Sequence, residues 1–447
     1  MTKADYLKLA DQVAAEIANG TLAPGDRLSP QRDFADAQGI AASTASRVYA
    51  ELLRRGLVVG EVGRGTFVSG DARRGVAAPG EPRGVRIDLE FNFPILPTQS
   101  ALIARSLAGL ERPADLELAL RPATSGGTAT VRDTAAKFLA HGPWAPSPDQ
   151  LVFTGAGRQS IATALAAVVP PGGRCGVEIL TYPFIKGIAA RLGVTLVPLA
   201  MDEGGVRPEA IQSAHREGQL AAVYLQPTLQ SPLGMTMSPA RRAELLRVVE
   251  TLDITVIEDN VYGFLDDAKP LAAHAPERCV VVDSLSKRVA PGLNLGFLVV
   301  PPRLRESVMA AVRSGGWAAP GYAFAAAQRM MRDGTIDELV RLKRLDAQAR
   351  QRIAADCLAG FDVRTSGKSY HLWLTLPAHW RSQALVAAAS RHDIGLTPST
   401  TFAVTPGHAP NAVRLALAGP SMELLDMGLR TLAGILNARE DDFDLTE

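Results

Sequence analysis

Between residues 150 and 300, short apolar runs alternate with stretches of helical periodicity, such as residues 159–169 and 239–251. Strands connected through helices run in the same direction, so this alternation predicts a largely parallel sheet covered by helices. The runs expected to form its strands are residues 151–154, 176–180, 221–225, 254–257, 280–284 and 296–300. A long helical stretch, 339–358, then leads into a smaller mixed region. The predicted fold class is therefore α/β.

The chain, at 447 residues, is long enough for two or more domains. Residues 71–86 are mainly Gly, Pro, Ala and Arg without apolar periodicity, which is typical of a linker. We therefore expect a small domain at residues 1–70 and a large one at residues 87–447. The formal net charge of +1 decides little, because a DNA-binding face needs only a local basic cluster.

Three helices are predicted in the small domain. The first covers residues 6–17, where apolar positions recur at helical spacing. The second is expected to start at the N-cap Ser29, with Pro30 in the first helical position, and to stop at Gly39. The third follows from about residue 43 to residue 55, with its apolar positions on the inner side.

A hairpin completes this small domain. Residues 57–59 and 66–68 flank Gly63-Arg64-Gly65, whose glycines allow a tight turn. Three helices followed by such a hairpin make a winged helix-turn-helix, in which the third helix enters the major groove of DNA. Thr44 and Arg47 face outward from that helix.

The sequence of this module resembles the GntR family of bacterial transcription regulators over residues 4–69, most closely at residues 23–32 and 63–68. The resemblance implies binding to a double-stranded DNA operator. Ala42 departs from the family, in which many members carry arginine there, so base readout is expected to be weaker or differently placed. The alternative is that the arginines only occupy solvated helix faces. The expected DNA contacts are Arg32, Ser43, Thr44, Arg47, Arg64 and Gly65.

A second motif begins where the run 280–284 ends. Lys287 follows Ser284 and Ser286, while Asp259 and Tyr262 close the apolar run upstream. A lysine that forms a Schiff base with pyridoxal phosphate needs an acid on the pyridine nitrogen and a donor to the ring hydroxyl. Asp259 and Tyr262 are the candidates for these two roles, and Lys287 for the Schiff base.

The cofactor also needs an anion site for its phosphate. Residues 154–159 end a strand and open a helix, so Gly157, Arg158 and Gln159 offer backbone N–H groups at a positive helix end. Ser284 and Ser286 are expected to flank the lysine on alternate strand positions. Tyr182, after the next strand, is a candidate to stack on the ring; the alternative is that it packs in the core.

Together these residues resemble the class I and II aminotransferases of fold type I from about residue 87 to the end of the chain. Combined with a GntR module, the chain is identified as a member of the MocR-type regulators. The resemblance implies that Arg414 binds the carboxylate of an amino-acid effector, for which its planar fork is suited. The alternative for Arg414 is a structural ion pair. A homodimer with its sites near the subunit interface is implied as well.

Two positions depart from the aminotransferase pattern. Asn294 stands where the family usually has an arginine for the phosphate, and we hypothesise that Arg158 or Arg288 replaces it. Ser231, or Gln230 in another register, stands where aminotransferases place an asparagine on the ring hydroxyl. The second departure puts efficient catalysis in doubt, but not cofactor binding.

Three functions remain open. The chain is expected to be a pyridoxal-phosphate-dependent regulator that senses an amino acid or the vitamer. It is alternatively a working aminotransferase, or a cofactor-free dimerisation scaffold. The three cysteines lack metal or disulfide spacing, and neither a signal segment nor a membrane span is evident, so the cytoplasm is expected. The seven histidines show no metal-ligand spacing, and His371 is expected to be a packed core residue.

Overall fold

The computed structural model describes residues 5–19, 21–23, 25–54, 57–61, 65–68, 84–120, 124–142, 144–405 and 408–438. Residues 71–83 of the expected linker and Arg64 of the expected wing lie outside the described residues.

A seven-stranded sheet forms the centre of the large domain, in the order β4-β12-β11-β10-β9-β5-β6. β12 runs in the opposite direction to the other six strands of this sheet, so the predicted largely parallel sheet is present. The strands are β4 (Leu151–Thr154), β5 (Arg174–Glu178), β6 (Thr195–Leu199), β9 (Ala222–Leu225), β10 (Thr255–Asp259), β11 (Cys279–Ser284) and β12 (Gly296–Val299).

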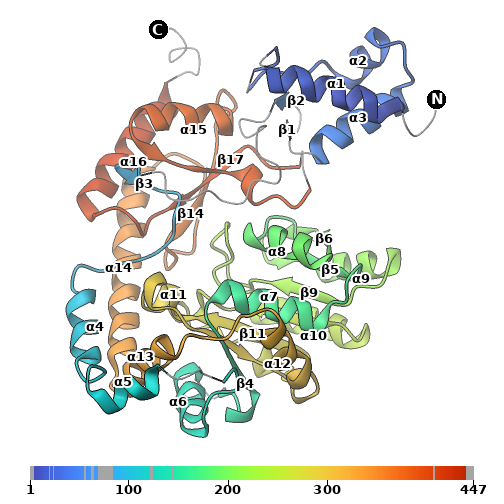
Figure 1. Ribbon diagram of the computed structural model, residues 1–447. Helices are drawn as coiled ribbons and strands as arrows, with labels where there is room; N and C mark the ends of the chain where they lie inside the picture. Colours follow the sequence, from blue (N-terminus) through green and yellow to red (C-terminus); the bar gives the residue numbers. More distant parts are fainter. Residues whose placement is uncertain are drawn as a thin grey trace.

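Helices cover both faces of this sheet (Figure 1). Because side chains alternate along a strand, Val281 packs into one apolar cluster while Val280 and Val282 pack into the other. This two-sided burial explains the continuous apolar runs in the sequence. The helices of the large domain include α6 (Ala129–Leu139), α7 (Gly157–Val168), α8 (Phe184–Leu192), α9 (Pro208–Glu217), α10 (Pro239–Thr251), α12 (Arg305–Ser314) and α13 (Gly321–Arg332).

The topology brings the predicted motifs together. β10 and β11 are parallel neighbours, with Asp259 beside Val282 in the register. Parallel strands end at the same edge of a sheet, so Asp259 and the segment that follows Ser284 meet there. That edge is where ligands bind in open α/β sheets.

The carboxy-terminal region forms a second, smaller sheet, β13-β14-β17-β16. Its bounds are β13 (Val363–Arg364), β14 (His371–Thr375), β16 (Thr397–Pro398) and β17 (Ala412–Ala416), and α15 (Ser382–Arg391) and α16 (Met422–Asn437) pack on it. β3 (Ile87–Asp88) pairs with β15 (Ile394–Gly395). The first strand after the expected linker therefore joins this carboxy-terminal sheet rather than the seven-stranded one. From here on, the small domain means the carboxy-terminal sheet with α15 and α16, and the large domain means the part built around the seven-stranded sheet.

A single long helix, α14 (Thr335–Cys357), runs alongside both domains (Figure 1). Toward the large domain, the Lys343 ammonium donates to the carbonyls of Lys287 and Val289 at 2.9 and 2.7 Å. Toward the small domain, Arg350 donates to the carbonyls of Leu417 and Pro420 at 2.6 and 2.7 Å. The buried side chains of Lys343 and Arg350 thus connect the helix to both sides of the site.

The winged helix-turn-helix is present at the amino terminus, at the upper right of Figure 1. It consists of α1 (Asp5–Asn19), α2 (Gln31–Ala37), α3 (Ala42–Arg54) and the antiparallel strands β1 (Val58–Glu61) and β2 (Gly65–Val68). The predicted start of α2 is off by one residue. Pro30 is the cap and no side chain caps the helix, while the Ser29 carbonyl accepts the Tyr49 hydroxyl at 2.5 Å.

In the part of the chain that the structure describes, no helix has both the length and the apolar character needed to cross a membrane.

Replacing Arg350 with methionine tests the contribution of α14. The variant leaves two buried carbonyls without their donor, and we expect it to lower the free energy of unfolding by about 3 kcal/mol. Urea unfolding followed by tryptophan fluorescence measures this. Arg352→Met is the matched control, because Arg352 lies on the same helix but is exposed. Equal midpoints for the two variants would contradict the account.

Candidate cofactor and DNA-binding sites

Lys287 lies at the carboxyl edge of the large sheet, on the short helix α11 (Leu285–Arg288) that follows β11. Its ammonium donates to the Asn92 carbonyl and lies 3.5 Å from the centre of the Phe93 ring. Burial lowers the pKa of Lys287 well below its ordinary value, and the positive charges of Arg414, Arg158 and Lys343 lower it further. A lysine that loses its proton so readily is suited to attack an aldehyde.

Asp259 is buried at the end of β10. Its carboxylate accepts hydrogen bonds from the Tyr224 hydroxyl at 2.6 Å, the Gln226 amide at 3.0 Å and the Val261 N–H at 3.2 Å. Burial raises the pKa of Asp259 against the lowering effect of these bonds. A cation beside the carboxylate would reverse that shift, and the protonated nitrogen of a pyridine ring is such a cation.

Tyr262 is buried three residues further on. Its hydroxyl accepts from the Asn92 side-chain amide at 3.0 Å, and its ring lies 5.3 Å from the His371 ring. Burial raises the pKa of Tyr262 to about 12, so the hydroxyl keeps its proton at neutral pH. It is therefore able to donate a hydrogen bond, as the role at the ring hydroxyl requires.

The predicted phosphate site is built from α7 and the serines beside Lys287. A Cβ on Gly157, the first residue of α7, would lie 2.9 Å from the Ser284 hydroxyl oxygen, so only glycine leaves this space open. The Ser284 and Ser286 hydroxyls lie 2.7 Å apart. The prediction that both serines lie on a strand is wrong: Ser284 ends β11, and Ser286 lies on α11 because the chain turns into a helix there. This turn brings the two hydroxyls to one side.

Arg158 and Arg288 are the two candidates to replace the arginine that usually binds the phosphate, and the structure distinguishes between them. Arg288 forms a buried ion pair with Asp283 and lies near the rings of Phe138 and Phe264. Its guanidinium is engaged there, so the version of the hypothesis that uses Arg288 is not favoured. Arg158 is exposed, and its guanidinium lies 3.9 Å from the centre of the Phe184 ring. Arg158 thus remains the candidate.

Three more predicted residues, Tyr182, Gln230 and Ser231, were expected to lie around the pyridine ring of the cofactor. Tyr182 follows β5 and packs 5.4 Å from Phe184, and its electrostatic neighbours include Asp259, Tyr262 and Arg158. The Gln230 side chain bonds the Leu180 carbonyl and the Leu233 N–H, at 2.6 and 3.0 Å, so both its ends are occupied by backbone. The register that uses Gln230 at the ring hydroxyl is therefore disfavoured relative to the one that uses the buried Ser231.

Arg414 is buried on β17, in the small domain. One terminal nitrogen donates to the Thr397 hydroxyl at 3.1 Å and to the Glu90 carbonyl, while its Nε is buried without a partner among the described residues. Burial lowers the pKa of Arg414 from its ordinary value. No ion pair to Arg414 is present in the described residues, and an unpaired donor there suits an incoming carboxylate.

Sequence reasoning missed four residues of this site. Tyr224 and Gln226 hold Asp259, and Lys343 supports the Lys287 backbone. Asn92 comes from a segment near the start of the large domain, almost 200 residues before Lys287 in the chain. Of these four residues, Tyr224 and Gln226 had a signal in the sequence. They lie at the end of a predicted strand, as Asp259 does.

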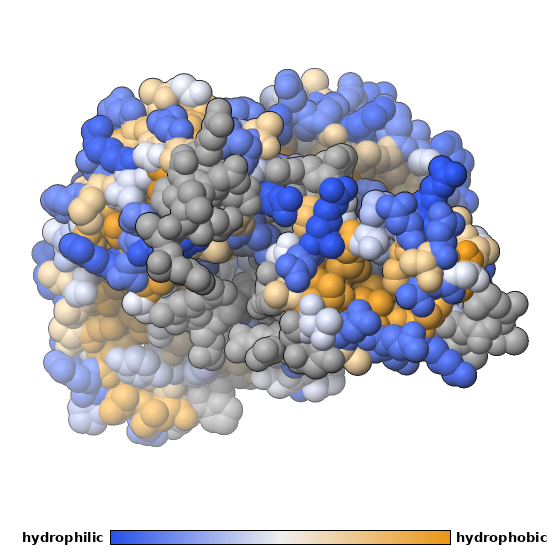
Figure 2. Space-filling view, turned by 90° about the horizontal axis from the view of Figure 1, so that it is seen from above, coloured by the Kyte–Doolittle hydropathy of each residue, from blue (hydrophilic) through white to orange (hydrophobic). Residues whose placement is uncertain are grey.

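Most of the residues predicted to contact DNA are exposed in the part of the chain that the structure describes. Arg32 on α2 and Ser43 and Arg47 on α3 are exposed, whereas Ala45 and Val48 on the opposite side of α3 are buried. Thr44 is half-buried. Gly65 starts β2 with a φ of +125°, a conformation that favours glycine. Seen from above in Figure 2, hydrophilic residues make up much of the coloured surface.

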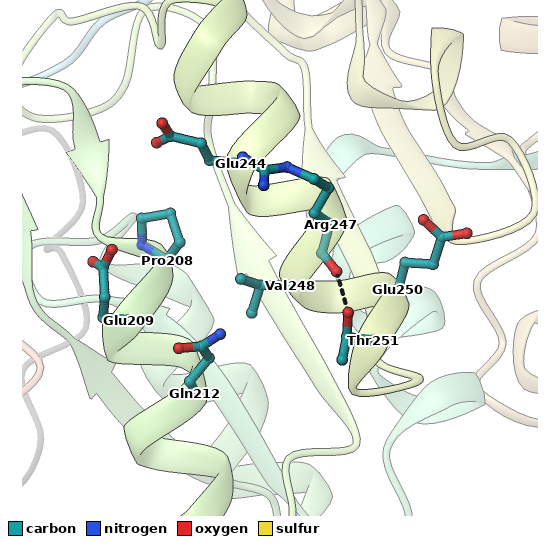
Figure 3. Close-up of a pocket in the computed structure, with 8 residues that line it drawn as sticks. All are labelled: Pro208, Glu209, Gln212, Glu244, Arg247, Val248, Glu250 and Thr251. Atoms are coloured by element: carbon teal, nitrogen blue, oxygen red, sulfur yellow. Dashed lines mark hydrogen bonds between the residues drawn. The ribbon is translucent and has the colours of Figure 1, made fainter.

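Two surface cavities lie elsewhere. One, of about 570 Å³, lies between α9 and α10 and is lined by Pro208, Glu209, Gln212, Glu244, Arg247, Val248, Glu250 and Thr251 (Figure 3). A larger one, of about 1050 Å³, lies on the other side of α10 and includes Arg242 and Asp266. None of the predicted site residues lines either cavity, so both are separate from the constellation around Lys287.

Pyridoxal phosphate fits the residues around Lys287. The acid, the phenol and the lysine converge at one sheet edge. Gly157 opens α7, where a helix has free amides, and it leaves space beside the Ser284 hydroxyl, which lies next to that of Ser286. Each partner that the cofactor needs is therefore present, apart from the usual phosphate arginine.

Two family models match the chain. Residues 117–432 match the aminotransferase class I and II family, and residues 5–68 match the gntR family of bacterial regulatory proteins. The chain belongs to the class I and II aminotransferase family. With the amino-terminal match, this member of the aminotransferase family has the architecture of the MocR-type GntR regulators, as the sequence predicts.

Similar proteins include transcription regulators and an aminotransferase. The HTH-type transcriptional regulator YdeF of Bacillus subtilis is 28% identical over 437 residues, which cover 97% of this chain and 94% of that protein. The pyridoxine biosynthesis regulator PdxR of Corynebacterium glutamicum is 26% identical over 317 residues, 68% of each chain. The α-aminoadipate aminotransferase LysN of Thermus thermophilus, solved with a phosphopyridoxyl-leucine, has the same fold: the TM-score is 0.70 at 21% identity, over 79% of this chain and 92% of that one.

Gly157→Ala tests the phosphate site. The added methyl group would displace the Ser284 hydroxyl, and we expect the affinity for pyridoxal phosphate to fall about tenfold or more, the loss of roughly one charge-assisted hydrogen bond. Equilibrium dialysis with absorbance detection measures this. Gly187→Ala on α8 is the control, because its methyl group meets open space, and it should leave the affinity unchanged. Unchanged affinity in both variants would place the phosphate elsewhere.

Proposed function

We propose that the protein is a transcription regulator that binds pyridoxal phosphate at Lys287, senses an amino acid or a vitamer there, and alters DNA binding in response. The observation that carries this proposal is the fusion of a winged helix-turn-helix to a domain whose Lys287, Asp259 and Tyr262 converge. An enzyme needs no DNA-binding module, whereas a regulator with a cofactor site needs both parts.

Each site residue has a role in this proposal. Bound pyridoxal phosphate supplies an aldehyde that captures primary amines and a ring that withdraws electrons. Lys287 holds the aldehyde, Asp259 pairs with the ring nitrogen, Tyr262 donates to the ring hydroxyl with Ser231 nearby, and Tyr182 covers the ring. The phosphate is bound by Gly157, Arg158, Gln159, Ser284 and Ser286.

Arg414 recognises the effector in this proposal. Its unpaired buried Nε supports the binding of a carboxylate, and its position on the small domain supports a coupling between effector and domain arrangement. An amino acid carries both a carboxylate for Arg414 and an amine for the cofactor aldehyde. That combination favours an amino acid over an amine or a keto acid alone.

The expected partners are a DNA operator and a second subunit. Arg32, Ser43, Thr44, Arg47, Arg64 and Gly65 are proposed to contact the DNA. The aminotransferase fold supports a homodimer, and Ile95, Leu120 and Leu345 are exposed large apolar side chains available for an interface. The three cysteines are free, which supports the reducing environment of the cytoplasm.

A working aminotransferase is the second candidate. The same Lys287, Asp259, Tyr262 and Arg414 support it, because transamination uses these groups. Asn294 and Ser231 count against it, since they replace residues that such enzymes place on the phosphate and the ring hydroxyl.

Visible absorbance after dialysis tests the proposed cofactor site. Wild-type protein saturated with pyridoxal phosphate should keep an absorption band of the Schiff base, and Lys287→Ala should lose it. Lys137→Ala, which changes an exposed lysine on α6, should keep the band. A wild-type protein without any band would favour the cofactor-free scaffold.

A further inference from the structure

Three segments from distant parts of the chain meet at the Asn92 side chain, which is only 4% exposed. Its amide nitrogen lies 3.0 Å from the Tyr262 hydroxyl oxygen and 3.3 Å from Nδ1 of His371. Asn92 follows β3, Tyr262 follows β10, and His371 begins β14. The contact thus joins the segment that follows β3, the cofactor site and the first residue of β14.

The backbone carbonyl of Gln230 fixes the direction of these hydrogen bonds. It lies 3.0 Å from Nε2 of His371, and a carbonyl oxygen only accepts, so Nε2 carries a hydrogen. His371 is buried, and the charged and titratable groups that face it are Arg414, Lys287 and Tyr262. Burial and the two positive charges lower the pKa of His371 to about 3. The ring is therefore neutral, and Nδ1 is an acceptor.

An accepting Nδ1 determines how Asn92 is oriented. The group that faces it must be the amide NH₂, and the same NH₂ lies within hydrogen-bond distance of Tyr262. The Tyr262 oxygen thus accepts from Asn92. Among the described residues, no group accepts the hydrogen of the Tyr262 hydroxyl. That hydrogen remains available to donate into the cofactor site.

We propose that His371 and Asn92 are positioning residues, which hold the Tyr262 hydroxyl as a donor to the ring oxygen of the cofactor. The inference rests on the proposed cofactor site. It also accounts for a departure from the aminotransferase pattern: where these enzymes place an asparagine on the ring hydroxyl, this chain has Ser231, and an asparagine from another segment lies on Tyr262 instead.

Removing the imidazole should undo this orientation. Without Nδ1 as acceptor, the Asn92 amide is free to turn over and present its oxygen to Tyr262. The tyrosine would then donate to Asn92 and no longer to the cofactor. His371 would in this way affect the cofactor without touching it.

The pH midpoint of the visible absorption band of the cofactor-loaded protein reports this hydrogen bond. A hydrogen-bond donor to the ring oxygen of the cofactor stabilises the form of the Schiff base that has lost its proton. It does so because the donor then satisfies the oxygen in place of the proton that the oxygen shared with the Schiff-base nitrogen. Losing the donor should raise the midpoint by about one pH unit. Groups that also influence the midpoint, such as Asp259 and Arg414, stay unchanged in the variants.

We expect His371→Phe, which keeps an aromatic ring beside Tyr262, to raise the midpoint as Tyr262→Phe does. The double variant should shift no further than Tyr262→Phe alone, since both changes remove the same bond. His371→Gln, which retains a donor and an acceptor, should restore a near-wild-type midpoint. His379→Gln, at a histidine of the small domain that bonds only a Leu436 carbonyl, should change nothing.

The outcomes are distinguishable. A shift in Tyr262→Phe but none in His371→Phe would overturn the positioning role and leave the cofactor site standing, and so would additive shifts in the double variant. A wild-type protein without the band would overturn the proposed function and this inference with it. If His371→Phe does not fold, Asn92→Leu removes the amide that orients the Tyr262 hydroxyl. An unchanged midpoint in that variant would overturn the proposal.

Discussion

The cofactor site depends on the amine of Lys287, a partly buried side chain that forms no ion pair among the described residues. Among the described residues, the amine donates to the Asn92 carbonyl and lies over the rings of Phe93 and Tyr262. The positive charges of Arg414, Arg158 and Lys343 lower the pKa of Lys287, whereas the charge of Asp259 raises it. Such an arrangement destabilises the charged form of the lysine and raises the free energy of the folded protein, unless the amine reacts to form an uncharged group. Reaction with an aldehyde removes that cost. A site that favours the neutral amine and sits opposite a buried acid is therefore adapted to a cofactor rather than to structural stability.

The surroundings of Lys287 also explain how the site reaches the rest of the molecule. Lys343 holds the carbonyls of Lys287 and Val289 from α14, and the same helix binds the small domain through Arg350 and Gln351. Arg414 and His371 approach from the small-domain sheet. A change at the lysine can thus shift the two domains relative to each other through one helix and one sheet. These contacts form a continuous physical route between the cofactor site and the arrangement of the two domains.

The sequence predicted those features whose signal is local. Strands buried on both faces read as apolar runs, so β4, β10 and β11 were located within a residue or two, and their parallel order placed Asp259 near Lys287. The edge strand β6 was missed because it is only partly buried and contains Pro198. Ser286 was set on a strand because the helical turn after Ser284 is too short for a periodic pattern. Asn92 and Lys343 could not be assigned, since their roles arise from contacts between segments distant in sequence.

The central claim is that chemistry at Lys287 changes DNA binding, and the affinity of the full-length protein for promoter DNA beside its gene tests this most directly. Affinity would be measured with the cofactor-loaded protein at fixed salt, with and without each standard amino acid, in the wild type and in Lys287→Ala. The account predicts that at least one amino acid changes the wild-type affinity by about five- to 150-fold, the usual range of coupling between sites, and leaves Lys287→Ala unchanged. Equal responses in both proteins, or none in the wild type, would contradict it.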